Sequence, residues 1–135
     1  MIITRIPPSP TGHLHIGTAR TALFNFLYAK QNGGKLVFRS EDTDRTRSKR
    51  EYEEEIIRDL NWLGITWDNQ EILRQSERAG TYRKYLEKLI DGGDAYLSTE
   101  ESKAEPGKQV TVVRLKNPGR DITFRDEVRG DITFN

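Results

Sequence analysis

Apolar positions alternate or recur at helical spacing along the first part of the chain. The run Met1–Ile6 predicts a strand, and the periodic stretch 17–32 predicts a helix that Gly33 and Gly34 end. Residues 35–39 then form a second apolar run, which predicts another strand. A strand, a helix and a strand in this order predict a βαβ unit with parallel strands and a right-handed crossover.

Two further amphipathic patterns follow the second predicted strand. Ser48 with Glu51 three residues later is a capping box, which predicts the start of a helix that Gly64 ends. Another helix is predicted to begin at Ser76 or Glu77 and to end near residue 91. The βαβ start and these helices together favour an α/β fold.

The pattern changes in the last third of the chain, where short strand-like runs replace the helical periodicity. We expect a strand at 95–97, a polar loop at 99–108, a strand at 110–115, and an antiparallel hairpin from the D-I-T-F segments at 121–124 and 131–134. A subdomain boundary is therefore expected near residues 100–108. The sequence stops within a strand-like pattern, so we expect a fragment of a longer protein.

Composition narrows the class of protein. The 135 residues carry a formal net charge of +1, so contact with RNA would need a local basic patch rather than a global field. There is no cysteine, which excludes disulfides and thiolate metal sites. No apolar run approaches the roughly 20 residues of a membrane span, and no signal-peptide pattern opens the chain. We expect a soluble, intracellular α/β protein.

The loop between the first strand and the first helix carries the strongest chemical signal. It reads R-I-P-P-S-P-T-G-H-L-H-I-G-T at residues 5–18 and holds both histidines of the chain. A tight loop that leads into a helix N-terminus presents backbone N–H groups to phosphate, and two imidazoles favour a nucleotide site. The alternative is a rigid turn with two surface histidines. The pattern matches neither a Walker loop nor a dinucleotide-binding fingerprint.

Polar residues near the ends of both predicted strands add to this site. Arg5 would bind a carboxylate or phosphate in bidentate fashion, or would reach solvent from an edge. Ser9 is explained equally well by turn chemistry. Because ligands of parallel α/β sheets bind beyond the carboxyl ends of strands, the loops 7–18 and 40–47 are predicted to face one crevice.

Charged residues fill the second of these loops. The segment S-E-D-T-D at 40–44 offers carboxylates for an ammonium group or a magnesium ion, or forms a solvated loop with Asp44 near a helix start. The basic run 45–50 would grip an RNA backbone, or would form a solvated face that pairs with Glu53, Glu54 and Glu55.

These segments together resemble those of glutamyl-tRNA synthetases, which are class I aminoacyl-tRNA synthetases. The matching segments are R-x-x-P-S-P-T-G at 5–12, L-H-I-G-T-A-R-T-A-L-F-N at 14–25, S-E-D-T-D at 40–44, R-E-Y-E-E at 50–54, W-L-G at 62–64, R-Q-S-E-R at 74–78 and D-E-V-R-G-D-I-T-F-N at 126–135. The H-I-G-T segment is this family's variant of the class I "HIGH" motif. The resemblance spans nearly the whole chain.

The resemblance implies a fold and an activity. The fold would be the first half of a Rossmann-like parallel sheet of the class I synthetase type at 1–100, followed at 101–135 by the beginning of an α+β connective insertion. The activity would be ATP-dependent activation of glutamate and its ligation to tRNA(Glu) in protein biosynthesis. ATP would act with Mg²⁺. We expect a cytoplasmic monomer with no membrane or DNA partner.

The resemblance also implies roles for individual residues. Catalysis would involve His15, Gly17 and Thr18. ATP would contact Pro8, Pro10, Thr11, Gly12, His13, His15 and Gly17. Glutamate would be bound by Arg5, Ser9 and Glu41, with Arg5 on an acidic group and Ser9 and Glu41 on the α-ammonium. The tRNA acceptor end would contact Asp44 and Arg47. No protein metal site is expected, and in particular no zinc site.

The chain also departs from the family's pattern. It lacks the lysine-rich KMSKS segment, and its stretch 96–108 is shorter than usual. We therefore expect the fragment alone to bind ATP weakly and to aminoacylate poorly or not at all. Two alternatives remain open: a paralogue that attaches glutamate to a queuosine-type base of tRNA, and a non-catalytic module that binds tRNA.

Overall fold

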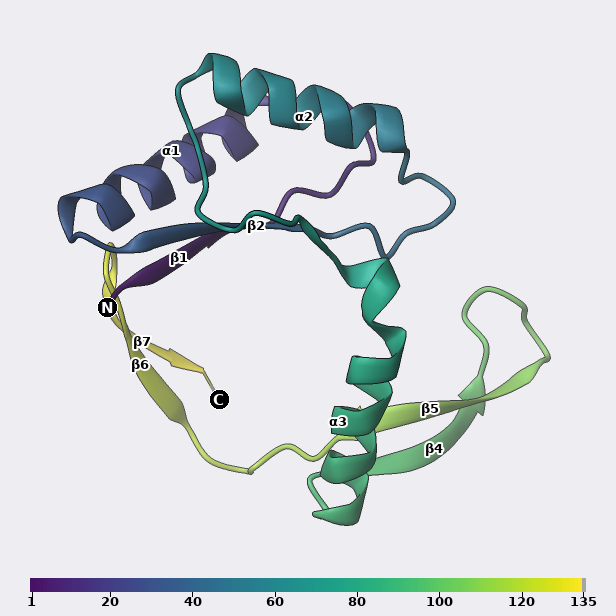
Figure 1. Cartoon of the computed structure of the whole chain (residues 1–135). Coiled ribbons are helices and arrows are strands. Elements are labelled where there is room, and N and C mark those ends of the chain that lie inside the picture. Colours follow the sequence, from purple (N-terminus) through teal and green to yellow (C-terminus); the bar gives the residue numbers. More distant parts are fainter. Residues whose placement is uncertain (135) are drawn as a thin grey trace. The chain divides into compact units, whose positions relative to one another are not determined.

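The computed structural model describes residues 1–134 and divides into two compact units, Met1–Gly80 and a second that begins at Thr81. Strand β1 (Ile3–Ile6), helix α1 (Ile16–Gln31) and strand β2 (Lys35–Ser40) open the first unit. β1 and β2 pair in parallel, with Ile3 opposite Lys35 and Ile6 opposite Phe38. The predicted βαβ unit is confirmed, and with it an α/β fold (Figure 1).

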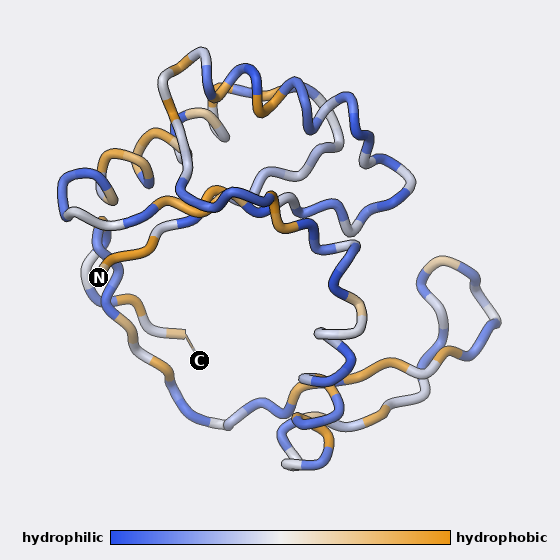
Figure 2. Tube along the Cα trace, viewed as in Figure 1, coloured by the Kyte–Doolittle hydropathy of each residue, from blue (hydrophilic) through white to orange (hydrophobic). Residues whose placement is uncertain are grey.

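The core of this unit lies between the sheet and two helices, α1 and α2 (Arg50–Trp62), which cover the same face of the sheet (Figure 1). Alternate strand residues point into it, and Leu36 and Phe38 are completely buried. Figure 2 shows the apolar stretches that run along both strands. The other core members are Ile6, Ala22, Ala29, Ile56, Leu60 and Ile65.

The return from α1 to β2 depends on two glycines. Gly33 has a φ of 59°, a conformation that favours glycine, and ends the helix. At Gly34 a Cβ atom would lie 2.3 Å from the backbone oxygen of Ile2, so only glycine permits this close approach. Both glycines therefore serve the geometry that brings β2 beside β1.

The predicted capping box at Ser48 and Glu51 is wrong. The N-cap of α2 is Lys49, and no side chain makes a capping hydrogen bond there. Ser48 donates its backbone N–H to Asp44 O at 2.8 Å, and Lys49 donates its own to Pro10 O at 2.9 Å. These bonds keep Ser48 in the preceding loop, so the N-cap falls one residue later than the pattern indicated.

A third strand, β3 (Leu73–Arg74), was not predicted. It pairs in parallel with β2 through Arg39–Leu73 and Ser40–Arg74, which gives the order β1-β2-β3. Before this pairing, Asn69 takes the place of a strand along β2: its Oδ1 accepts from Phe38 N at 2.8 Å and its Nδ2 donates to Phe38 O at 3.1 Å. The Asn69 side chain thus satisfies the backbone N–H and C=O of Phe38 at the edge of β2. Apolar periodicity does not reveal such a contact.

A 3-10 turn, η1 (Gln75–Arg78), follows β3 and leads into helix α3 (Ala79–Asp91). In the second unit, β4 (Ala95–Glu101) pairs antiparallel with β5 (Gln109–Leu115), and β6 (Ile122–Asp126) pairs antiparallel with β7 (Gly130–Phe134). The predicted hairpin of D-I-T-F segments is confirmed.

The predicted loop at 99–108 is wrong in its first three residues, which belong to β4. Their side chains are polar, so the apolar pattern ends early, but the backbone continues to pair with β5. Glu100 and Arg114 form a cross-strand ion pair in which Arg114 Nε lies 2.6 Å from Glu100 Oε1.

In residues 1–134, no helix is long and apolar enough to cross a membrane.

Candidate functional site

The loop from β1 to α1, residues 7–15, lies beside the loop from β2 to α2, residues 41–49, which we call the acidic loop. Two backbone hydrogen bonds join them: Glu41 N donates to Pro8 O at 2.9 Å, and Lys49 N donates to Pro10 O at 2.9 Å. Pro8 and Pro10 are both buried. Both loops leave the carboxyl ends of parallel strands, so they share one region at that edge of the sheet, as the sequence predicts.

His15 is the N-cap of α1, and its ring lies over the first helical turn. The Nδ1 atom accepts a 3.4 Å hydrogen bond from Thr18 N, and Nε2 lies 3.0 Å from Thr18 Oγ1. A Cβ atom on Gly17 would be 3.1 Å from this ring. Glycine at this position therefore leaves room for the imidazole at the positive end of the helix dipole.

His13 has a different environment, although it belongs to the same loop. Its Nδ1 lies 2.7 Å from Glu55 Oε1, and its ring meets the Tyr52 ring edge-on with centroids 5.3 Å apart. Both partners belong to α2. His13 therefore has contacts that explain its position without a ligand, and its role towards ATP stays a prediction.

Three charged side chains meet where β1 and β2 end. Arg5 Nη1 lies 3.9 Å from Glu41 Oε1, and the Arg39 guanidinium also pairs with Glu41. All three are partly exposed, with Arg5 the most open at 45% of its side chain. Sequence reasoning identified Arg5 and Glu41 but missed Arg39. The group offers two cations and one anion at one place.

Two hollows adjoin the β1–α1 loop, with volumes of about 270 and 340 Å³, near the lower end of small-molecule pockets. Both are lined by Pro7, Pro8, His15 and Thr18. The first extends over Gly17, and the second extends over Ser9, Thr11, Gly12 and His13. All the residues predicted to contact ATP except Pro10 line one of these hollows. Pro10 lines a separate cleft beside the start of α2.

Asp44 and Arg47 contact each other within the acidic loop. Arg47 Nε donates to Asp44 Oδ2 at 2.6 Å, while Asp44 Oδ1 accepts from Thr46 Oγ1 at 2.7 Å. The Thr46 hydroxyl and the Arg47 guanidinium lower the pKa of Asp44 to about 2. The loop therefore holds Asp44 ionised and Arg47 oriented, whatever these residues bind.

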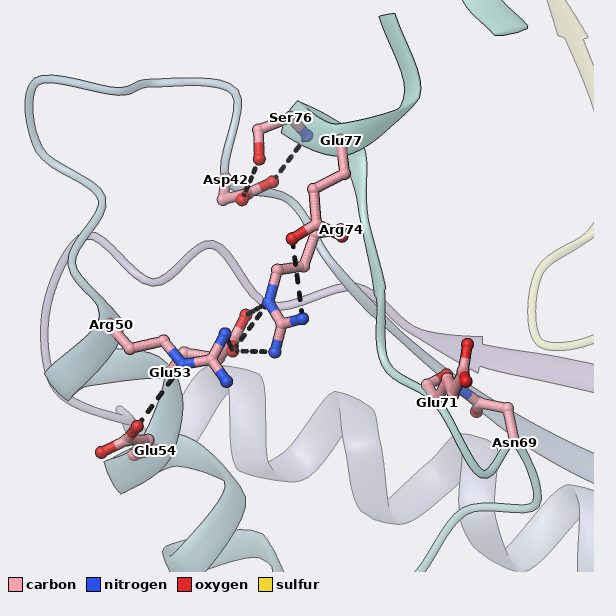
Figure 3. A network of polar contacts seen from close by, with 9 residues as sticks. All are labelled: Asp42, Arg50, Glu53, Glu54, Asn69, Glu71, Arg74, Ser76 and Glu77. Atoms are coloured by element: carbon pink, nitrogen blue, oxygen red, sulfur yellow. Dashed lines mark hydrogen bonds and ion pairs between the residues drawn. The ribbon is translucent and has the colours of Figure 1, made fainter.

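A network of polar contacts surrounds the cleft beside the start of α2 (Figure 3). Glu53, whose side chain is only 4% exposed, receives Arg74 Nη2 at 2.7 Å and Arg50 Nη1 at 3.1 Å. Asp42 binds Ser76 of η1. The pairing of Arg50 with Glu53 agrees with one of the two interpretations of the basic run. The roles of Arg74 and Ser76 were not predicted, although the R-Q-S-E-R segment at 74–78 marked both residues as part of a motif.

The carboxylates of the acidic loop are already engaged by protein groups. Within residues 1–134, no group of three or more His, Cys, Asp or Glu residues is placed to hold a metal ion.

The chain is similar to known proteins in both sequence and structure. Residues 1–105 match the family described as class I tRNA synthetases (E and Q), catalytic domain. A glutamate–tRNA ligase of Rubrobacter xylanophilus is 48% identical over 96% of the chain, and one of Aquifex aeolicus is 59% identical over 69% of it. These matches cover 28% and 19% of the two relatives, so the chain spans less than a third of their length.

The structure is similar to a crystal structure of a glutamate tRNA ligase from Elizabethkingia meningosepticum in complex with its amino acid. The TM-score is 0.85 at 29% sequence identity, and the match covers 99% of this chain and 36% of that one. A glutamate-tRNA synthetase structure from Elizabethkingia anophelis matches equally well, with a TM-score of 0.85.

Proposed function

We propose that this chain, which belongs to the family of class I tRNA synthetases (E and Q) through its catalytic domain, carries the first half of a site that activates glutamate with ATP for ligation to tRNA(Glu). The observation that carries this proposal is the junction of the two loops at the carboxyl ends of β1 and β2. There Pro8 lines both hollows together with His15, the N-cap of α1, and its carbonyl oxygen accepts from the backbone N–H of Glu41, whose side chain pairs with Arg5. One region thus offers complementary charge to a nucleotide phosphate and to glutamate.

The chemistry of this activation needs little from the protein beyond positioning and charge. A carboxylate oxygen of glutamate attacks the α-phosphorus of ATP, the bond to pyrophosphate breaks, and glutamyl adenylate forms. A hydroxyl at the 3′ end of the tRNA then attacks the carbonyl carbon and releases AMP. The attacking carboxylate is ionised at pH 7, so the first step requires no general base.

The residues of this chain divide the task between its two loops. His15 and the N-terminus of α1, kept open by Gly17, would stabilise the negative charge on the phosphates. Arg5 would hold an acidic group of glutamate, and Glu41 with Ser9 would meet its ammonium. Arg5 Nη1 and Glu41 Oε1 lie 3.9 Å apart, so bound glutamate would replace this contact with two of its own.

The remaining assignments extend the same proposal. Asp44 and Arg47, which the loop holds together, would contact the tRNA acceptor end. The boundary between a nucleotide-binding part at 1–100 and an insertion at 101–135 stays a prediction, as do a monomeric state and a place in the cytoplasm. Mg²⁺ would enter with ATP.

Binding of a non-hydrolysable glutamyl adenylate to the ¹⁵N-labelled chain tests this proposal. We expect saturable shifts of amide signals in residues 5–18 and 40–47, weaker binding of the aspartyl analogue, and a loss of that preference in Arg5→Ala. Equal binding of both analogues, unaffected by the Arg5 change, would overturn the assignment. Glutamate-dependent ATP–pyrophosphate exchange by the 135 residues alone should be slight or absent, and robust exchange would contradict the half-site proposal.

A further inference from the structure

The acidic loop contacts a segment far along the chain, the turn η1 that follows β3. We propose that Ser76 in this turn is a positioning residue, which fixes the acidic loop so that Glu41 presents its carboxylate beside Arg5. The inference rests on the proposed function, because it concerns the residue assigned to the ammonium of glutamate. Ser76 itself does not line the two hollows beside the β1–α1 loop.

Ser76 binds both oxygens of Asp42, the residue next to Glu41. Its backbone N–H donates to Asp42 Oδ1 at 2.9 Å, and its hydroxyl donates to Asp42 Oδ2 at 2.5 Å. Burial raises the pKa of Asp42, but the two bonds from Ser76 outweigh this and leave that pKa below its usual value. Asp42 therefore stays ionised, and hydrogen bonds to an ionised acceptor are among the strong ones.

A second contact joins the same turn to the far side of the acidic loop. The Arg45 guanidinium donates to Ser76 O at 3.5 Å. A hydrogen bond of this length is weak, so it orients the Arg45 side chain more than it stabilises the loop. Ser76 therefore contacts the acidic loop through its backbone N–H, its hydroxyl and its carbonyl oxygen. The contacts at Asp42 and Arg45 flank Asp44, so the turn holds the loop on both sides of that residue.

Ser76 can serve as a fixed point because the chain before it is anchored in the core. Arg74 pairs with Ser40 in the β2–β3 ladder, and its side chain makes a fork of hydrogen bonds to the buried carboxylate of Glu53 (Figure 3). Only Gln75 lies between this anchor and Ser76. Through Ser76, the acidic loop is therefore held in place by contacts with the sheet and with α2, and not only by its connection to the end of β2.

The acidic loop has few other ties to the rest of the unit. Glu41 N and Lys49 N bind the β1–α1 loop, and the Glu41 side chain pairs with Arg5 and Arg39. The bonds of Asp44 stay within the loop. Loss of the Ser76 hydroxyl would leave the Asp42 carboxylate with one fewer donor in a partly buried place. We expect the loop, and Glu41 with it, to become more mobile without unfolding of the sheet.

Amide hydrogen exchange of the full chain tests this inference in Ser76→Ala, with Ser76→Thr as rescue and Glu77→Ala as the matched control in the same turn. The probes are the hydrogen-bonded amides of Glu41, Ser48 and Lys49. We expect exchange about ten-fold faster in Ser76→Ala, near-normal exchange in the other two variants, and a higher pKa of Asp42 by NMR titration only where the hydroxyl is lost.

Two results would overturn the inference: loop exchange in Ser76→Ala within two-fold of Glu77→Ala, or equal acceleration at every amide of Met1–Gly80. Should Ser76→Ala fail to fold, Asp42→Asn tests the same contact. The amide that replaces the Asp42 carboxylate keeps only one of the two oxygens that accept from Ser76. These readouts need no ligand. Failure of the wild-type chain to bind glutamyl adenylate would thus count against the proposed function, and an unchanged loop would count against the role of Ser76.

Discussion

Replacing Arg74 with methionine should destabilise the first unit strongly, because it leaves a buried carboxylate with too few partners. Glu53 is 4% exposed and receives three hydrogen bonds of 2.7–3.1 Å from Arg74. After the change only Arg50 would remain, at 3.1 Å, from a side chain that is 62% exposed. Removal of one partner from a buried ion pair costs about 3–5 kcal/mol, and the remaining contact with Arg50 favours the lower end, about 3 kcal/mol.

Urea unfolding monitored by tryptophan fluorescence measures this cost in the relevant unit. Both tryptophans lie within Met1–Gly80, and Trp67 packs against Phe38 with ring centroids 4.7 Å apart. If the free energy of unfolding falls by about 1 kcal/mol per molar urea, the midpoint of unfolding should fall by roughly 3 M. The matched control is Arg58→Met, whose exposed pair with Asp59 should contribute less than about 1 kcal/mol.

A double variant separates the loss of an ion pair from the loss of packing. In Glu53→Gln, Arg74→Met no charge from the pair stays buried, so the double variant should be more stable than Arg74→Met alone. The reasoning is refuted if Arg74→Met matches Arg58→Met within about 0.5 kcal/mol. It is also refuted if the loss of unfolding free energy in the double variant equals the sum of the losses in Glu53→Gln and Arg74→Met.

Three further changes test other parts of the structure. Gly34→Ala places a Cβ 2.3 Å from a backbone oxygen and should cost about 1–3 kcal/mol in the same urea assay; an unchanged midpoint would contradict that contact. Asp44 should titrate with a pKa of about 2 by NMR, so its stabilising contribution is present above pH 4 and is lost as the pH falls towards 2; Thr46→Val should raise this pKa, and an unshifted titration would be inconsistent with the hydroxyl contact. Gly17→Ala should displace the His15 ring and weaken ATP binding with little change in stability, and unaltered ATP affinity would argue against a role for that ring.

The sequence predicts the parts of the fold that depend on local pattern. The βαβ start, its glycine-ended helix and the D-I-T-F hairpin all follow from periodicity and turn residues. The start of α2 does not, because backbone bonds to Pro10 and Asp44 override the capping preference of Ser48. The bond to Pro10 joins distant segments, and neither bond leaves a periodic pattern in the sequence.

The candidate site shows the same division. Arg5, Glu41 and His15 could be identified because chemical groups at strand ends and helix starts are visible in the sequence. The contacts of Glu53 with Arg74 and of Ser76 with Asp42 could not, since a single buried glutamate in a charged helix and a serine in a polar turn look like surface residues. Only the folded chain shows that residues some 20 to 34 positions away are their partners.

Paramagnetic broadening by Mn²⁺·ATP tests most directly whether the β1–α1 loop is a nucleotide site. In the ¹⁵N-labelled chain we expect selective loss of amide signals from residues 8–18, reduced in His15→Ala, with the β4–β5 hairpin unaffected. The matched control is Thr111→Ala in that hairpin, which should broaden as the wild type does. Broadening centred outside the first unit, or uniform along the chain and insensitive to His15, would contradict the proposed half-site.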